Sequence, residues 1–361
     1  MAEPLKEMFN QAYFERLAKE TEAVYPKLRR ADFIRELQRG NEARELNARM
    51  RHAAITLRSH LPSDFREAVS VLKEVAPRMP KGYTALLYPD FVGQFGHDDP
   101  AFSLDALKYF TSFGSSEFAV REFFRREAKG TLKVMRGWAE DDNEHVRRLA
   151  SEGSRPRLPW SFRLDAVLKE PKLTTPILER LRSDESLYVR KSVANHLNDF
   201  SKDHPEYMVE LLRSWNLAHP HTAWIAKHAS RTLIKAGDPA ALALFAFDTN
   251  ASLRVDDLQV SPKRLKLGDT MEISFTVVSE ASRSQQLVID YAIHYRKANG
   301  STSRKVFKLK ELELPAKASI NLGKRQRIVD FSTRKHHAGE HRVEIMVNGR
   351  IMAPGTFHLA L

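Results

Sequence analysis

The segments AEDDNEHVRRLASEG (139–153) and RSDESLYVRKSVANH (182–196) repeat one pattern at an offset of 43 residues. An acid, a valine and a basic pair recur at matched positions, which are Asp141 with Asp184, Val146 with Val189, and Arg147-Arg148 with Arg190-Lys191. A weaker third copy, HTAWIAKHASRTL (221–233), places Lys227 and His228 at a similar point. This offset lies within the roughly 40–47 residues of HEAT-type helix pairs. The repeat therefore predicts a solenoid of stacked helix pairs, with basic residues along its concave face.

Outward from the repeat, apolar residues recur at three- and four-residue spacing, which predicts helices through residues 1–250. The clearest blocks are 104–113, 117–139, 145–153, 175–183, 188–200, 206–215 and 223–237. Prolines fall between such blocks, where helices are expected to stop. These prolines are Pro62, Pro89, Pro100, Pro159, Pro171, Pro205, Pro220 and Pro239. The prediction for residues 1–250 is an all-α HEAT-like repeat domain.

The apolar period changes to two near Thr249, after which strands are expected. Alternating apolar residues mark MEISFTV (271–277), QLVIDYAIHY (286–295) and HRVEIMVNG (341–349). Asn-Gly pairs, the favoured residues of tight hairpin turns, stand at 299–300 and 348–349. About seven short strands in roughly 105 residues predict an all-β immunoglobulin-like sandwich over residues 251–361. TNASLR (249–254) is the expected linker.

The composition favours an anionic partner, because the formal net charge is +12 and the sequence pI is near 9.7. Residues 251–361 carry 19 Lys and Arg against 11 Asp and Glu, so most of the excess lies in the sandwich. The chain has no cysteine, which excludes disulfides, cysteine nucleophiles and cysteine-ligated metals and suits the cytoplasm. Residues 1–20 have no apolar h-region, and no apolar run is long enough to be expected to span a bilayer. The sequence also has no GxSxG, HExxH or phosphate-binding glycine loop.

The stretch RPRLPWSFRLDAV (155–167) carries the most chemical information. It places Trp160 five residues before Asp165, after a turn rich in proline and arginine. An aromatic face and a carboxylate form a poor nucleophile or metal site, but both stabilise a nearby cation. The stretch therefore predicts a site for a positively charged ligand or transition state.

Several blocks in chain order resemble the HEAT-repeat DNA alkylation repair glycosylases, and within them the AlkC family. They are MAEPLKEMFN (1–10), LPSDFREAVSVL (61–72), SSEFAVREFF (115–124), LPWSFRLDAV (158–167) and YVRKSVANHLND (188–199). The trailing sandwich is similar to the immunoglobulin-like domain of some AlkC proteins. One position departs from the family pattern, since Glu122 stands where proline is expected after EFAVR. Two acids, Glu117 and Glu122, therefore compete for a role in that segment.

The resemblance implies a monomeric DNA glycosylase that hydrolyses the N-glycosidic bond of cationic bases, 3-methyladenine and 3-methylcytosine, in duplex DNA. It also implies base excision without base flipping. An N3-alkylated purine is already a cationic leaving group, so the enzyme needs no general acid, metal or cofactor. It must stabilise an oxocarbenium-like sugar and hold one water, which a carboxylate near C1′ can do. Asp165 is the first candidate and Glu117 the second, with the rings of Trp160 and Trp224 against the sugar.

Basic residues of both domains are candidates for phosphate contacts, which position a duplex without reading its bases. In the helical part they are Arg147, Arg148, Arg163, Arg190, Lys191, Lys227 and Arg231. In the sandwich, the run STRKHHAGEHR (332–342) supplies Arg334, Lys335, His336 and His337. We expect the helical array to cradle one side of the duplex and the sandwich to clamp the other.

Each assignment has a structural alternative. A lone aspartate after an aromatic is often a helix cap or a solvated residue, and Trp138 and Trp215 are predicted to be core. Glu117 could pair with Arg121 one turn on. Arg147 and Arg190 could instead form ladders between helices. At the level of function, the alternatives are a DNA-binding scaffold without catalysis and a protein-interaction solenoid whose charge only aids solubility.

Overall fold

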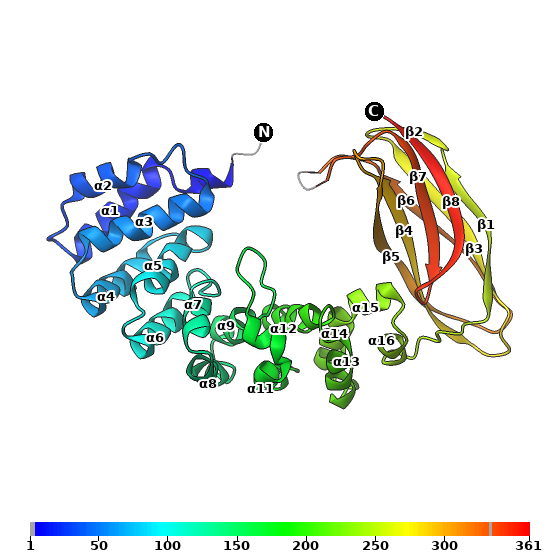
Figure 1. Cartoon of the computed structure of the whole chain (residues 1–361), viewed down its shortest axis with the longest axis horizontal. Coiled ribbons are helices and arrows are strands. Elements are labelled where there is room, and N and C mark those ends of the chain that lie inside the picture. The colour runs from blue at the N-terminus through cyan, green and yellow to red at the C-terminus, as the bar shows by residue number, and fades with distance from the viewer. Residues whose placement is uncertain (1–3, 332–333) are drawn as a thin grey trace. The chain divides into compact units, whose positions relative to one another are not determined.

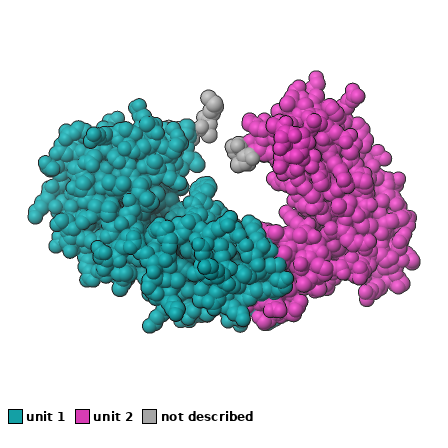
Figure 2. All heavy atoms as spheres, viewed as in Figure 1, with its two compact units in different colours: residues 1–208, 215–229 teal, residues 209–214, 230–361 magenta. Residues whose placement is uncertain are grey.

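The computed structural model describes residues 4–331 and 334–361. The chain divides into two compact units, which Figure 2 colours separately. Unit 1 comprises residues 1–208 and 215–229, and unit 2 comprises residues 209–214 and 230–361. Unit 1 is helical, and unit 2 combines short helical segments with strands. None of the helices in the described part of the chain has the length and apolar character needed to cross a bilayer.

The helices of the chain are numbered in sequence order, and those of unit 1 follow one another as a stack (Figure 1). Their bounds are α1 (Gln11–Val24), α2 (Arg30–Gln38), α3 (Leu46–His60), α4 (Phe65–Val75), α5 (Leu87–Phe95), α6 (Pro100–Phe110), α7 (Val120–Arg126), α8 (Ala128–Trp138), α9 (Glu144–Gly153), α10 (Asp165–Lys169), α11 (Thr175–Arg180), α12 (Leu187–Phe200), α13 (Pro205–Ser214), α14 (Pro220–Ala229), α15 (Arg231–Ala236) and α16 (Pro239–Ala243). Short 3₁₀ helices are η1 (Leu5–Met8), η2 (Ala76–Arg78), η3 (Tyr83–Leu86) and η4 (Pro171–Thr174).

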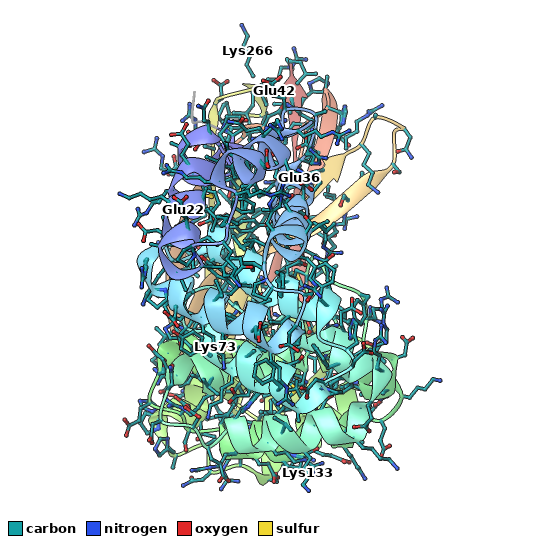
Figure 3. The ribbon with its side chains drawn as sticks, turned by 90° about the vertical axis from the view of Figure 1, so that its left-hand side faces the viewer. Glu22, Glu36, Glu42, Lys73, Lys133 and Lys266 are labelled. Carbon is teal, nitrogen blue, oxygen red and sulfur yellow. The ribbon has the colours of Figure 1, made fainter. Side chains whose placement is uncertain are left out.

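Helix α8 shows why these segments are helical. Leu132, Met135 and Trp138 recur at three-residue spacing and are buried, so one stripe of the helix faces the core. Lys133 lies between them in sequence, is exposed and points away from the helices (Figure 3). Trp138 and Trp215 were both predicted to lie in the core, and each is 4% exposed.

Two of the predicted helical blocks are each divided in the structure. Block 117–139 breaks at Glu127, whose non-helical backbone ends α7 and whose carboxylate accepts the Gly130 N–H to begin α8. Block 223–237 breaks at Ser230, between α14 and α15. Periodicity missed both breaks because the apolar spacing continues across them.

The prolines begin helices more often than they end them. Pro100, Pro205, Pro220 and Pro239 each occupy the first position of a helix, and Pro171 begins η4. Pro89 lies in the first turn of α5. A first-turn proline loses no intrahelical hydrogen bond and has a suitable φ, so it marks a start as readily as a stop. Pro62, which follows the end of α3, and Pro159, in the loop after α9, lie between helices as predicted, whereas the other predicted prolines mark helix starts.

The internal repeat appears as repeated hydrogen bonds. Nη1 of Arg147 donates to the carbonyls of Asp141 and Asp142, and Nη1 of Arg190 donates to the corresponding carbonyls of Asp184 and Glu185. Asp184 also accepts two hydrogen bonds from Arg147, at 2.7 and 3.2 Å. The hydrogen bonds to carbonyls join each helix to the loop before it, and the pair of Arg147 with Asp184 joins one repeat to the next.

The strands form two sheets, with orders β1-β3-β6 and β2-β8-β7-β4-β5. Their bounds are β1 (Leu253–Ser261), β2 (Arg264–Lys266), β3 (Thr270–Ser279), β4 (Gln285–Arg296), β5 (Thr302–Leu314), β6 (Ser319–Arg327), β7 (Gly339–Val347) and β8 (Arg350–Ala360). All pairings are antiparallel except the short β2 with β8. The three strands predicted from alternation are β3, β4 and β7, and both Asn-Gly pairs lie in turns between strands.

The alternating pattern fails on β4, which is buried on both faces over most of its length. One face joins the core between the sheets, through residues such as Ile289 and Tyr291. On the other face, Val288 packs with Ile234, Leu242 and Phe247 from the α15–α16 segment. The change from helix to strand lies between α16 and β1, close to the expected linker, but the compact unit of the strands also includes α15 and α16.

Asp290 on β4 gives a pH-dependent prediction for unit 2. It is 1% exposed, and burial raises its pKa from 3.8 to about 6, against the attraction of Lys235 and Lys308. The folded chain thus binds the Asp290 proton more tightly than the unfolded chain does. The free energy of unfolding therefore falls as the pH rises from 3.8 to about 6, and it stays lower at higher pH. Asp290→Asn is expected to raise the free energy of unfolding at pH 8 by up to about 3 kcal/mol, and by less at pH 5.

Urea unfolding of both proteins at the two pH values measures this effect. Glu344→Gln is the control of opposite sign. Burial opposes the charge of Glu344, but His294, Arg342 and Arg304 together lower its pKa, so neutralising it should destabilise unit 2 at pH 8. If the stability gained by Asp290→Asn were the same at pH 5 and pH 8, the raised pKa of Asp290 would be contradicted.

Candidate active site

Two hollows lie side by side in unit 1, and Trp160 lines both. The smaller, of about 390 Å³, is bounded by the turn before α7, the end of α9 and the loop that follows α9. The larger, of about 790 Å³, is bounded mainly by α3, α5 and α7. Residues lining both are Tyr83, Leu86, Ser115, Phe118 and Trp160.

Two carboxylates line the smaller hollow. Glu117 lies in the turn before α7, and Glu152 is near the C-terminal end of α9. Arg148, one turn earlier on α9, lies between them, with Nη1 2.7 Å from Oε2 of Glu117 and Nη2 3.6 Å from Oε1 of Glu152. Ser115 donates to the same Glu117 oxygen at 2.7 Å. The contacts fix one oxygen of each carboxylate, while Oε1 of Glu117 has no hydrogen-bond partner among the described residues.

The ion pairs continue from Glu152 to Arg155, which also lines the hollow, and on to Asp199. Nη1 of Arg155 is 2.8 Å from Glu152, and two further nitrogens of Arg155 bind both oxygens of Asp199 at 2.9 and 3.1 Å. Burial opposes the charge on Arg148, but Glu117 and Glu152 together hold its pKa above the usual value. Because each carboxylate has a guanidinium neighbour, the ion pairs hold Glu117 and Glu152 in place.

Trp160 is exceptional in both exposure and backbone geometry. Its side chain is 80% exposed, and its φ of 64° lies in the left-handed region that favours glycine. The loop that carries it, residues 154–164, connects α9 to α10. A large exposed aromatic in strained backbone is typical of a residue kept for binding and not for packing.

The structure does not bring the other predicted catalytic residues to this hollow. Asp165 begins α10, is exposed and is not among the lining residues of either hollow. Trp224 on α14 stacks on His228, with ring centroids 5.0 Å apart, and the guanidinium of Arg190 lies 5.8 Å from its ring. Catalytic roles for Asp165 and Trp224 therefore remain predictions without support from the geometry.

The two acids of the α7 segment, Glu117 and Glu122, lie in different hollows. Glu117 lines the smaller hollow, whereas Glu122 lines the larger one and pairs with Arg125. The expected alternative pairing of Glu117 with Arg121 is wrong, because Arg148 takes that place and Arg121 points into the core.

Comparison with known proteins identifies both parts of the chain. Residues 106–233 match the family described as DNA alkylation repair enzyme, and residues 254–361 match the C-terminal Ig-like domain of the uncharacterised protein YhaZ. The solved structure of Pseudomonas fluorescens alkylpurine DNA glycosylase AlkC, bound to DNA containing an abasic site analog, is 46% identical. The match has a TM-score of 0.96 and covers 99% of this chain and 100% of that one. The chain belongs to the AlkC family.

A second relative of this AlkC family member is the uncharacterized protein YhaZ of Bacillus subtilis strain 168. It is 41% identical over 348 residues, which is 96% of this chain and 97% of YhaZ. The resemblance stated from the sequence blocks is thus confirmed over both the helical part and the immunoglobulin-like part.

Sequence reasoning missed Glu152, Phe118 and Arg155 as residues of the smaller hollow. The signal for Glu152 was its spacing from two arginines, four residues after Arg148 and three before Arg155, which places charges of opposite sign on one helical face. Nothing in the sequence placed that face beside Glu117.

The basic residues proposed for DNA contact in the helical part have different surroundings. Arg147 forms a bidentate pair with Asp184, and Arg190 donates to backbone carbonyls. These contacts favour the alternative that both arginines link neighbouring helices over the prediction that they bind phosphates. Arg148 is held by Glu117 and Glu152. Arg163 and Lys191 are exposed, and Lys227 and Arg231 are half-buried. The larger hollow adds Arg51, Arg125 and Arg126, which are all exposed.

The sandwich has its own basic hollow, of about 520 Å³, lined by Tyr295, Arg296, Lys297, Ser303, Lys305, Phe331, Arg334, Lys335 and His337. Arg334 stacks on Tyr295 at 4.6 Å, and Lys335 pairs with Asp330. His336 is 5% exposed and bonds to Asp330, which favours a structural role over the predicted DNA contact. Ser332 and Thr333, which begin the predicted basic run, lie outside the described residues.

Proposed function

We propose that this AlkC family member is a DNA glycosylase that hydrolyses the N-glycosidic bond of cationic alkylated bases, 3-methyladenine and 3-methylcytosine, in duplex DNA. The observation that carries the proposal is the smaller hollow, where two oriented carboxylates and an exposed tryptophan surround one space. The 46% identical P. fluorescens protein is an alkylpurine DNA glycosylase, which supports the same reaction class.

The chemistry follows from the charge of the substrate. The C1′–N bond breaks as its electron pair leaves with the base, which becomes neutral, and positive charge develops on the deoxyribose. Glu117 and Glu152 stabilise that charge electrostatically, and one of them orients the attacking water and accepts its proton. The ring of Trp160 adds cation–π stabilisation of roughly 0.5–2 kcal/mol. No group in this scheme has to protonate the base.

We further propose that the base is excised without being flipped into an enclosed pocket. Glycosylases that flip a base surround it with a close-fitting cavity. Here the ring of Trp160 is 80% exposed, so the smaller hollow is open where the DNA would approach. Such a site reaches a sugar at the edge of the duplex more readily than it encloses a base.

Release of bases from methylated duplex DNA tests the activity. The purified protein, in buffer with EDTA, is expected to release 3-methyladenine and 3-methylcytosine, identified by chromatography. Asp165→Asn, assayed alongside, is expected to retain release if the chemistry lies at Glu117 and Glu152. If the native protein released bases and Asp165→Asn did not, Asp165 would be the catalytic carboxylate. DNA binding without release by the native protein would favour the scaffold alternative.

We propose that both domains, residues 1–250 and 251–361, contact the DNA, the second through its basic hollow. Deleting residues 251–361 would test this poorly, because it would uncover Ile234, Leu242 and Phe247, which pack with Val288. Lys297→Ala/Lys335→Ala leaves the fold intact, since both side chains are exposed.

The double substitution is expected to make the slope of log K against log salt shallower by about 2, one counterion for each lost contact. Lys324→Ala/Arg325→Ala is the matched control, because this exposed pair lies on β6, outside the lining of the basic hollow. Binding titrations at several salt concentrations measure the slope, and equal slopes for the two variants would rule out the hollow as a DNA contact.

A further inference from the structure

Arg121 on α7 is a buried arginine whose hydrogen bonds all go to Gly153, at the end of α9, and to the loop that follows it. It is 0% exposed and does not line either hollow. Its Nη1 donates to the carbonyls of Gly153, at 3.2 Å, and Arg155, at 2.6 Å. Its Nη2 donates to the carbonyl of Phe162.

These carbonyls lie at the two ends of the loop that carries Trp160. Gly153 is the last residue of α9, and Phe162 follows Trp160 by two positions. The guanidinium also lies 5.4 Å from the centre of the Phe162 ring. Within the loop, the backbone N–H of Leu164 donates to the carbonyl of Pro156 at 3.1 Å. Arg121 is therefore the side chain that joins the start of the loop to the segment immediately after Trp160.

An arginine is a costly way to fill a core. Burial lowers the pKa of Arg121 to about 10, so it remains charged at neutral pH, and its Nε has no partner among the described residues. An apolar side chain would fill the space without a buried charge. What only arginine supplies is a rigid planar fork that reaches several carbonyls at once and fixes their separation.

We propose that Arg121 is a positioning residue for base excision. By tying Gly153, Arg155 and Phe162 together, it holds the loop in the conformation that places Trp160 beside Glu117 and Glu152. Trp160 itself is 80% exposed in strained backbone, so its own packing does not hold it there. This inference rests on the proposed glycosylase function.

The test compares Arg121→Lys with Arg49→Lys. Arg49 serves as the control because it is 3% exposed and also donates to backbone carbonyls, those of Lys6, Phe9 and Arg44. It lies far from the loop in sequence and differs from Arg121 in also pairing with Glu7. Both lysine variants keep a buried cation but lose the planar fork. Single-turnover release of 3-methyladenine at saturating protein measures the chemical step, and binding to a duplex with a stable abasic-site analogue measures affinity separately.

Arg121→Lys is expected to slow single-turnover release at least about tenfold, because small displacements of a catalytic group are costly. Its affinity should stay within about twofold of the native value, and Arg49→Lys should release base at the native rate. Adding Trp160→Ala should lower the rate much less in the Arg121→Lys background than in the native protein, because coupled residues are not additive. If Arg121→Lys does not fold, the same measurements are made on Arg121→Gln, which buries no charge.

A native rate in Arg121→Lys, or the same effect of Trp160→Ala in both backgrounds, would overturn the positioning role. Absence of release by the native protein would instead overturn the proposed function.

Discussion

Replacing Glu117 with glutamine is expected to slow release of 3-methyladenine by roughly 100- to 1,000-fold, the loss seen when one preorganised charge-stabilising group is removed from an active site. Glutamine keeps the shape of the side chain and can still contact Arg148, but it has no negative charge to stabilise the sugar cation. Because Ser115 and Arg148 hold the side chain in place, the change removes charge with little change in geometry. Single-turnover release at saturating protein is the measurement.

Glu122→Gln is the matched control for this substitution. Glu122 lies five residues further along, also pairs with an arginine and also lines a hollow that contains Trp160, but it is in the larger hollow. Its neutralisation is expected to change release less than about threefold, in line with a surface ion pair. If Glu122→Gln were the inactive protein and Glu117→Gln the active one, the larger hollow would be the site of chemistry.

The fold was predictable because its signals are local. Helical periodicity, strand alternation and Asn-Gly turns each depend on residues close in sequence, and the 43-residue repeat gave the order of the helix pairs. The helix breaks at Glu127 and Ser230 were not predicted, because one apolar pattern continues across two helices at each of them. The second buried face of β4 was also missed, because α15 and α16 reach it from outside the strand region.

The candidate site was only half predictable for the same reason. Trp160 lines both hollows, whereas Asp165, which was predicted to act with it from the nearby LPWSFRLDAV stretch, lines neither. In a loop, a separation of five residues does not imply contact. The carboxylates that line a hollow with Trp160 come from positions 117 and 152, brought there by the packing of α7 and α9. Likewise, the repeated arginines looked like a phosphate-binding row, and only the structure showed Arg147 paired with Asp184.

Trp160→Gly is expected to separate activity from stability. The left-handed φ of 64° costs an L-residue about 1–2 kcal/mol, which glycine avoids, while glycine adds roughly 0.5–1 kcal/mol of unfolded-state entropy. An 80% exposed ring contributes little burial. The melting temperature should therefore stay the same or rise. Release of 3-methyladenine should fall about 30-fold, which corresponds to losing about 2 kcal/mol of cation–π stabilisation.

Trp138→Gly provides the contrast, because Trp138 is 4% exposed in α8. Removing that ring is expected to cost about 3–5 kcal/mol of stability, with release lost only in proportion to unfolded protein. Thermal melting and single-turnover release, measured on both variants, distinguish the two tryptophans. A clear loss of stability in Trp160→Gly would mean that the ring supports the loop and is not held in strain for the reaction. A stable but slow Trp160→Gly would show that the strained backbone is maintained for catalysis, since nothing in folding requires a tryptophan there.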